Sequence, residues 1–279
     1  MKKLFLILSA AVALSSLAFA KPYGEKSRPD SAGDIVFADG TATAWREGLT
    51  LTEEQKKAAV AVIFYAGTEC SNGGEWRILG VGLENATGRG NTLAWAWTRD
   101  DDKAEGYEAK IEGIICTKNE SKGGAATATF TGDLDGSDNW QILCEAVSDE
   151  EMGGNYPAWE WVNAYAKNNA LSGEYAQGWY LPTVAELCML YRQKDTVKAV
   201  LEAAGGTKIS DAGDCVAYWS SSQSPFDFWG DFNFAWSVLF DDDDFIYHAG
   251  DICETTKHTA NSVCAVRAFN GEEKTMTVR

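Results

Sequence analysis

Short apolar runs and helical spacings alternate along the chain, and together they predict a mixed α+β protein. Strand-like runs flanked by Gly, Asn or Asp occupy 34–38, 78–83 and 92–98. Thr52 with Gln55, and Thr183 with Glu186, form capping-box patterns that predict a helix just after each Thr. The run 58–66 fits either a buried helix or a buried strand, because periodicity does not separate the two over so short a stretch.

The middle of the chain carries further helical spacing. Helices are expected at 140–147, 158–168, 184–191 and 196–204. Gly205 and Gly206 end the last of these. Trp159, Trp161 and Tyr165 bring aromatic mass to one side of the second helix, and we interpret this as core packing.

The chain changes character after 216. Residues 216–269 have no helical period and combine short apolar runs with many Asp, Ser, Gly and aromatic residues, which predicts small strands carrying long loops. No internal repeat and no interdomain linker is visible. We therefore expect a flexible leader at 21–33, a single domain at 34–271 and a C-terminal tail at 272–279.

The first twenty residues have the pattern of a cleaved signal peptide. Lys2 and Lys3 precede an apolar run at 4–17, and Ala18-Phe19-Ala20 predicts cleavage before Lys21. The run is short for a membrane span and no Cys follows it to accept a lipid. An exported protein is expected, periplasmic, cell-surface or secreted, with no membrane insertion after cleavage.

Composition narrows the class of partner. The formal charge of −17 repels phosphate backbones and anionic membrane surfaces, which disfavours nucleic acid as a partner. A hydrophobic fraction of 45% excludes an intrinsically disordered chain. Seven Cys allow some disulfides in an exported protein, but the odd number leaves at least one unpaired within the chain. With two His and no CxxC motif, a zinc site is poorly supported.

Four ordered motifs resemble a known group. Residues 178–187 read GWYLPTVAEL, similar to the G-W-x-L-P-T-x-x-E-L signature of bacterial C-type-lectin-like domains of the formylglycine-generating-enzyme-like and fibrobacter types. Residues 218–222 (YWSSS), 235–238 (AWSV) and 263–269 (VCAVRAF) resemble the later motifs of that group.

The N-terminal half resembles a narrower family, the treponemal variable proteins diversified by a retroelement. The matching segments are 33–40, 51–56, 78–83 and 136–140. The resemblance implies one C-type-lectin-like fold, with a small twisted antiparallel sheet, two main helices and long loops. It also implies a variable ligand-binding surface near the C-terminus.

Framework roles follow from the same resemblance. Trp179 and Trp219 are expected to fill the core, and Pro182 with Thr183 to start a helix. Trp236 is expected to be fixed on a strand. Arg267 is expected to bridge a carboxylate, with Glu186 as the candidate.

The composition of 226–250 gives an independent check on diversification. Asn codons randomised at their adenines reach most residue types, but not Lys, Glu, Gln, Met or Trp. The segment contains no Lys, Glu, Gln or Met, and all its acidic residues are Asp. Trp229 and Trp236 fall outside the reachable set. Trp236 is expected on a strand as a fixed residue, and Trp229 must be a framework residue too or it counts against diversification. The alternative is ordinary loop composition, because turns favour Asp and Gly.

The expected variable surface mixes aromatic and short polar side chains, as antibody paratopes do. Its candidates are Asp227, Phe228, Asp231, Asn233, Asp241, Asp242, Asp243, Asp244, Phe245, Tyr247 and His248. Strand alternation places Phe234 and Trp236 in the core and turns Asp231 and Asn233 the other way. The ligand is expected to be a protein or a glycan of unknown identity.

The Asp241–Asp244 run has three interpretations: a solvated loop, a contact patch for a basic partner, or a calcium site. Residues 133–139 resemble a calcium loop loosely, but Cys144 stands where the bidentate Glu belongs. No cofactor or metal is expected, with calcium as the alternative.

Enzyme function is the less favoured class. A related branch of the fold oxidises cysteine to formylglycine, but that chemistry needs a closely spaced reactive Cys pair, and Cys253 and Cys264 are eleven positions apart. A structural disulfide or a buried thiol is the expected role of these residues. Neither a G-x-S-x-G nucleophile elbow nor a P-loop is present. A fixed C-type-lectin-like structural or adhesive protein remains a second alternative.

Overall fold

A computed structural model describes residues 21–88, 90–99, 102–119, 122–148, 153–209, 216–226, 230–241 and 248–269. The predicted signal peptide and the predicted tail lie outside these ranges. The protein is 28% helical and 30% strand with antiparallel sheets, so the predicted mixed α+β class is confirmed.

A six-stranded antiparallel sheet forms the centre of the molecule, with strand order β10-β15-β4-β3-β1-β2. Its strands are β1 (Asp34–Phe37), β2 (Ala42–Ala44), β3 (Ala59–Gly67), β4 (Arg77–Ala86), β10 (Trp179–Tyr180) and β15 (Val263–Ala268). The ambiguous run at 58–66 is therefore mostly strand. The last strand, β15, lies between β10 and β4, so the C-terminal segment closes the sheet built by the N-terminal half.

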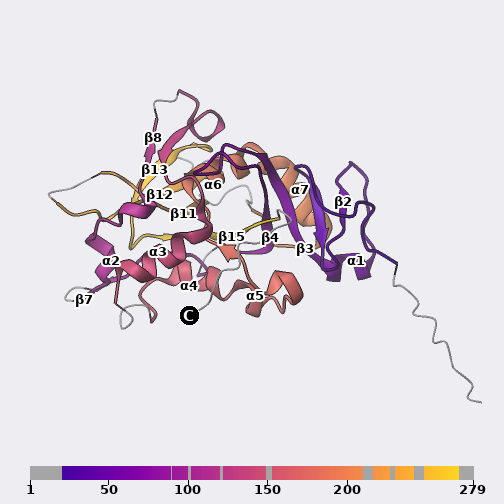
Figure 1. Cartoon of the computed structure of the whole chain (residues 1–279), viewed down its shortest axis with the longest axis horizontal. Helices are drawn as coiled ribbons and strands as arrows, with labels where there is room; N and C mark the ends of the chain where they lie inside the picture. The colour runs from indigo at the N-terminus through magenta and orange to yellow at the C-terminus, as the bar shows by residue number, and fades with distance from the viewer. Residues whose placement is uncertain are drawn as a thin grey trace, which may run out of the picture.

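Both faces of this sheet are buried, which explains why its strands lack a clear alternation of apolar and polar residues. Val62 and Phe64 of β3 pack into one hydrophobic cluster, and Ile63 between them packs into the other. Helices α6 (Val184–Arg192) and α7 (Lys194–Ala204) cover the first face. Helices α4 (Pro157–Asn163) and α5 (Tyr165–Asn168) cover the second, as Figure 1 shows, and α3 (Asn139–Ala146), which lies beside β11, adds Leu143 to the same hydrophobic cluster.

Both predicted capping boxes are confirmed. Helix α1 (Glu53–Ala58) begins after Thr52, whose hydroxyl accepts from the Gln55 amide. Helix α6 begins after Thr183 in the same way, with its hydroxyl 3.2 Å from the Glu186 amide nitrogen. Such caps stabilise a helix by about 1 kcal/mol relative to Ala.

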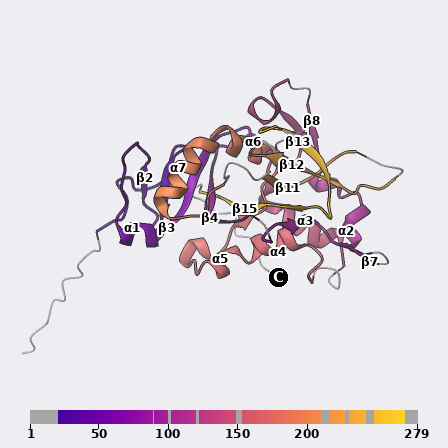
Figure 2. The ribbon, with the colours of Figure 1, turned by 180° about the vertical axis from the view of Figure 1, so that it is seen from behind.

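A second, three-stranded sheet follows in the C-terminal part, with order β11-β12-β13. Its strands are β11 (Ala217–Gln223), β12 (Phe234–Leu239) and β13 (Ile252–Thr256). The Trp219 amide donates to the Ser262 carbonyl, which ties β11 to the segment leading into β15. Figure 2 shows this sheet beside α6 from the opposite side.

The remaining elements are short. They are β5 (Leu93–Ala94), β6 (Thr98–Arg99), β7 (Asp102–Lys103), β8 (Cys116–Lys118), β9 (Phe130–Gly132), β14 (Ala260–Asn261), α2 (Glu105–Glu108) and the 3₁₀ turns η1 (Glu112–Ile114), η2 (Gly124–Ala126), η3 (Gly136–Asp138) and η4 (Gly173–Ala176). The strand predicted at 92–98 is thus divided between β5 and β6, and the helix predicted at 158–168 is divided between α4 and α5.

Residues 21–33, predicted as a leader, lie against the edge of the large sheet. Lys26 forms backbone hydrogen bonds with Ala42, and its ammonium group lies 2.8 Å from the Asp34 carboxylate. Pro29 is buried. Among the helices of the described ranges, none has the length and apolar character needed to cross a membrane.

Candidate ligand-binding surfaces

The three-stranded sheet divides those predicted ligand-binding residues that the structure describes into two groups at opposite ends. Residues 224–233 connect β11 to β12, and residues 240–251 connect β12 to β13. Successive connections in an antiparallel sheet lie at opposite strand ends, and the six residues of β12 span roughly 20 Å. Of the candidates that the structure describes, Asp231 and Asn233 therefore lie at one end, here called the 224–233 end, and Asp241 and His248 lie at the other, here called the 240–251 end.

Much of each surface falls beyond the described ranges. The predicted contact residues outside them are Asp227, Phe228, Asp242, Asp243, Asp244, Phe245 and Tyr247. Trp229 is also outside them. Asp231, Asn233, Asp241 and His248 are described and can be placed.

At the 224–233 end, Asp231 is half-buried. Asn233 is held by a backbone hydrogen bond, and its side-chain oxygen is buried. The Asn233 carbonyl accepts from the Lys257 amide at 2.9 Å. Its side-chain oxygen is buried and accepts no hydrogen bond from any residue in the described ranges. Asn233 was predicted as a ligand contact because alternation turns it away from Trp236, but this oxygen does not reach solvent.

Aromatic side chains lie at the same end. Phe226 is 44% exposed and packs edge-on against Phe234, with ring centroids 5.4 Å apart. Phe234 is half-buried rather than in the core, because it stands at the first position of β12. Trp236 is buried as predicted and donates its indole N–H to the Cys116 carbonyl at 2.7 Å. Phe226 was not among the predicted contacts, although its place beside Asp227 pointed to it.

A buried lysine, Lys257, packs beneath the 224–233 end. The Lys257 ammonium donates to the carbonyls of Gly106 and Tyr107 at 2.7 and 3.0 Å, and lies 4.6 Å from the Trp95 ring centroid. Burial lowers the pKa of Lys257 well below its ordinary value. No sequence pattern singled out this residue, since a lone Lys near a strand end usually lies in solvent.

The 240–251 end has a different character. His248 is exposed, and its amide donates to the Asp251 carboxylate at 2.8 Å. Asp241 is half-buried, with one carboxylate oxygen that is buried and has no hydrogen-bond partner in the described part of the chain. The interpretations of the Asp241–Asp244 run stay open, because the last three of these residues are outside that part.

The framework tryptophans are buried as expected. Trp219 donates its indole N–H to the Leu93 carbonyl at 2.8 Å, and Trp179 donates to the Tyr175 carbonyl at 2.9 Å. Trp95, which no motif marked, donates in turn to the Ser220 carbonyl at 3.0 Å. The bonds of Trp219 and Trp95 attach β11 to residues 93–95 from the other half of the chain, whereas the Trp179 bond is local and joins β10 to η4.

The expected pairing of Arg267 with Glu186 is wrong. Arg77 forms the ion pair with Glu186, at 2.8 Å, inside the protein. Arg267 instead donates to the carbonyls of Gln177 and Glu174 at 3.0 and 2.8 Å. Gly178 is the first residue of the signature. Its φ of +84 favours glycine, and a Cβ at this position would lie 3.2 Å from the Arg267 guanidinium.

The loop at 133–139 forms the turn η3 and the start of α3. Asp133 accepts from the side-chain amides of Asn72 and Asn139 at 3.0 and 2.7 Å, and Asp135 pairs with Arg77 at 2.8 Å. Burial raises the pKa of Asp133 to about 6. Within the described ranges, no cluster of three or more His, Cys, Asp or Glu residues is arranged to hold a metal ion.

The two cysteines considered for redox chemistry lie in different sheets. Cys253 is half-buried in β13, and Cys264 is a buried free thiol in β15. Burial raises the pKa of Cys264 above its ordinary range, which disfavours the reactive thiolate.

Comparison with known proteins finds no match: no family model, no curated protein and no solved structure is similar to this chain.

Proposed function

We propose that this chain is an exported ligand-binding protein of C-type-lectin-like fold, displaying a sequence-variable surface on the connections of its three-stranded sheet. The proposal is carried by two observations together. The strands of this sheet are buried, and the segment that contains their connections has a restricted amino-acid composition. Residues 218–223 of β11 are all buried, as are residues 235–239 of β12. The segment 226–250 lacks Lys, Glu, Gln and Met, as adenine randomisation of Asn codons requires.

The positions of the four motifs support the fold part of this proposal. Segment 178–187 supplies β10 and the start of α6, and 263–269 supplies β15, with Trp179 paired to Arg267. The other two motifs supply β11 and β12, with Trp219 paired to Ser237. Motifs that are distant in the sequence are thus neighbours in space, as a shared framework requires.

Trp236 belongs with the buried strands and not with the variable connections, since it is buried and hydrogen-bonded within a strand. Substituting it would remove a core side chain, so it belongs with the framework. The surfaces themselves provide half-exposed Phe and Asp side chains, a combination suited to protein or glycan contacts. The deeply buried Cys264 thiol makes the formylglycine-type alternative weaker.

The deciding experiment is to sequence the DNA around this gene. We expect a second copy of the segment encoding 218–269, next to a reverse transcriptase gene. That copy should differ from the gene only at adenines, with Asn codons opposite residues such as Asp231, Asp241 and His248.

Absence of such a copy would reject diversification and leave a fixed structural or adhesive protein of the same fold. A copy with substitutions spread over all four bases would reject it as well. Codons alone cannot support the claim for Asp or His, because all codons for these residues end in C or T. The copy is therefore the decisive observation.

A further inference from the structure

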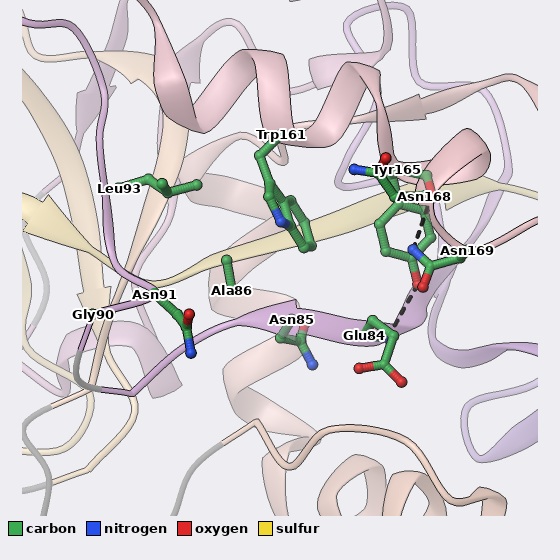
Figure 3. Close-up of a pocket in the computed structure, with 10 residues that line it drawn as sticks. All are labelled: Glu84, Asn85, Ala86, Gly90, Asn91, Leu93, Trp161, Tyr165, Asn168 and Asn169. Carbon is green, nitrogen blue, oxygen red and sulfur yellow. Dashed lines mark hydrogen bonds between the residues drawn. The ribbon is translucent and has the colours of Figure 1, made fainter.

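A pocket of about 480 Å³ lies away from both proposed surfaces, between the end of β4, residues 90–93 and helices α4 and α5 (Figure 3). None of its described lining residues comes from 216–250. Its volume falls within the range of roughly 300–1,000 Å³ typical of small-molecule sites. Neither the sequence patterns nor the proposed function accounts for it.

One wall of the pocket is aromatic. Figure 3 shows the Trp161 indole projecting from α4 between Leu93 and Tyr165, toward Ala86. Its ring centroid lies 5.5 Å from that of Tyr165, which is buried and packs in turn on Trp179 at 4.7 Å. The Tyr165 hydroxyl accepts from the Glu84 amide at 3.1 Å, so the helix side and the strand side are tied together. Trp161 is half-buried and thus offers a supported apolar face.

The other walls are rich in side-chain amides. Asn85, Asn91 and Asn169 each donate to a backbone carbonyl, at 3.2, 3.3 and 2.9 Å. These bonds orient the amides and leave further donors and acceptors for a ligand. Asn168 stands at the exposed rim.

Asn85 lines the pocket from β4, but its side chain points away from Trp161 and Tyr165 and is held by the Thr207 carbonyl. It is 9% exposed, and its side-chain oxygen is buried without a hydrogen bond from any described residue. Because this oxygen is closed off from solvent, it offers no acceptor to a ligand in the pocket, and the polar contacts must come from the other amides.

The charge of the pocket excludes one class of ligand. Glu84 is its ionisable carboxyl group, and one of its oxygens accepts a hydrogen bond from the Thr207 hydroxyl. No Lys or Arg is among the described lining residues. An anionic ligand would therefore meet repulsion without a compensating cation.

We propose that this pocket binds a neutral pyranose unit, free or at the end of a glycan. A pyranose has an apolar face of C–H groups, which suits the electron-rich face of the Trp161 indole. Its hydroxyl groups both donate and accept, which matches the amides of Asn91, Asn168 and Asn169 and the Glu84 carboxylate. This inference does not depend on the proposed variable surface.

The test uses the mature full chain with a panel of hexoses and their methyl glycosides, including gluco, galacto, manno and N-acetylglucosamine forms. Tryptophan fluorescence and saturation-transfer NMR measure binding. We expect at least one member to bind with a Kd near 1 mM, as a small pocket with few contacts allows. Equal binding of a hexose and its methyl glycoside identifies a glycan terminus, and preference for the free hexose identifies a free sugar.

Variants locate the site. Asn168→Ala lies on the exposed rim and should raise the Kd about tenfold without loss of stability. Trp161→Ala should remove detectable binding, and Trp161→Phe, which preserves a ring and the fold, should retain part of it. Trp76→Phe is the matched control, since Trp76 is 60% exposed and does not line the pocket, and it should leave the Kd unchanged.

Three results would overturn the inference. One is the absence of binding by every sugar in the panel up to about 50 mM, far above the Kd expected for such a site. Another is binding that both Asn168→Ala and Trp161→Ala leave unchanged. The third is binding of tetramethylammonium in preference to every sugar, which would make Glu84 and Trp161 a cation site.

Discussion

The Arg77 guanidinium donates to the Glu186 carboxylate at 2.8 Å inside the protein, joining residues 109 positions apart. Arg77 also donates to the Cys70 carbonyl at 2.6 Å and to the Tyr180 hydroxyl at 2.9 Å. Burial alone would lower the pKa of Arg77, but the surrounding oxygens of Tyr180, Glu186 and Asp135 raise it above its ordinary value. The network holds the start of β4 against the start of α6.

Removing one partner of this buried pair should strongly destabilise the fold. Glu186→Gln removes the fully buried carboxylate and leaves Arg77 with Asp135, which is partly exposed, as its ion-pair partner, so the cost should approach the roughly 3–5 kcal/mol typical of breaking a buried pair. Urea denaturation followed by circular dichroism measures the change. Glu53→Gln is the control, because Glu53 forms an exposed pair with Lys56 and its loss should cost under about 0.5 kcal/mol.

A double-mutant cycle tests which arginine, Arg77 or Arg267, is energetically coupled to Glu186. Glu186→Gln combined with Arg77→Met should cost less than the sum of the single changes, because neither buried charge is left alone. Glu186→Gln combined with Arg267→Gln should be nearly additive. Strong coupling to Arg267 and none to Arg77 would contradict the observed pairing.

Asp133 should make the protein less stable as the pH rises from 4 to 7. Burial raises its pKa from 3.8 to about 6, so the folded state holds this proton more tightly than the unfolded state. Its stabilising contribution is complete below the unfolded pKa and is lost as the pH rises through 6. A shift of about two pKa units corresponds to at most about 3 kcal/mol.

Asp133→Asn should therefore lose less stability than the wild type over this pH range, measured by urea denaturation at each pH. Other carboxyl groups contribute to the total, so the difference between the two proteins is the informative quantity. Asp195→Asn, at an exposed position, should follow the wild-type curve. A variant curve parallel to the wild type would show that Asp133 titrates normally.

The buried thiols should resist alkylation. Cys70, Cys116, Cys188 and Cys264 are buried and free, and burial raises the pKa of Cys188 to about 12 and those of the other three further above their ordinary value. Iodoacetamide at pH 8 should label these positions only after unfolding, as peptide mass spectrometry can measure. Rapid labelling of Cys264 in the native protein would revive the case for redox chemistry.

Framework and connection residues should respond differently to substitution. Trp219→Ala removes a fully buried indole and its hydrogen bond to Leu93, and should cost about 3–5 kcal/mol. His248→Ser, at an exposed position of the 240–251 end, should change stability by less than about 0.5 kcal/mol. Thermal unfolding of the two variants measures both effects, and comparable losses would mean that this end is part of the framework.

The helix starts were predictable because capping is local. Thr183 and Glu186 are three residues apart, and their mutual hydrogen bonds depend on little else. The strand β3 was ambiguous for a physical reason, since burial on both faces removes the alternation that marks a strand. The 3.6-residue period offered no substitute over nine residues.

Long-range pairings were not predictable in the same way. Nothing near Glu186 in the sequence indicates Arg77, and the resemblance pointed to Arg267 instead. The sugar-sized pocket combines residues 84–93 with 161–169, and Asn and Trp in those segments carry no spacing that links them. The division of the predicted surface could have been found, because strands at 217–223, 234–239 and 252–256 require their connections to alternate between ends.

That division has a consequence for how the protein can change. Two ends separated by a six-residue strand share few side chains, so the free-energy effects of substitutions at one end should add to those at the other. Under the proposed function, one uninterrupted stretch of the gene would therefore encode two groups of contact residues that selection could improve one at a time. A substitution that improves one end should keep its effect whatever residues stand at the other end. The number of variants to be searched is then the sum of the numbers for the two ends and not their product.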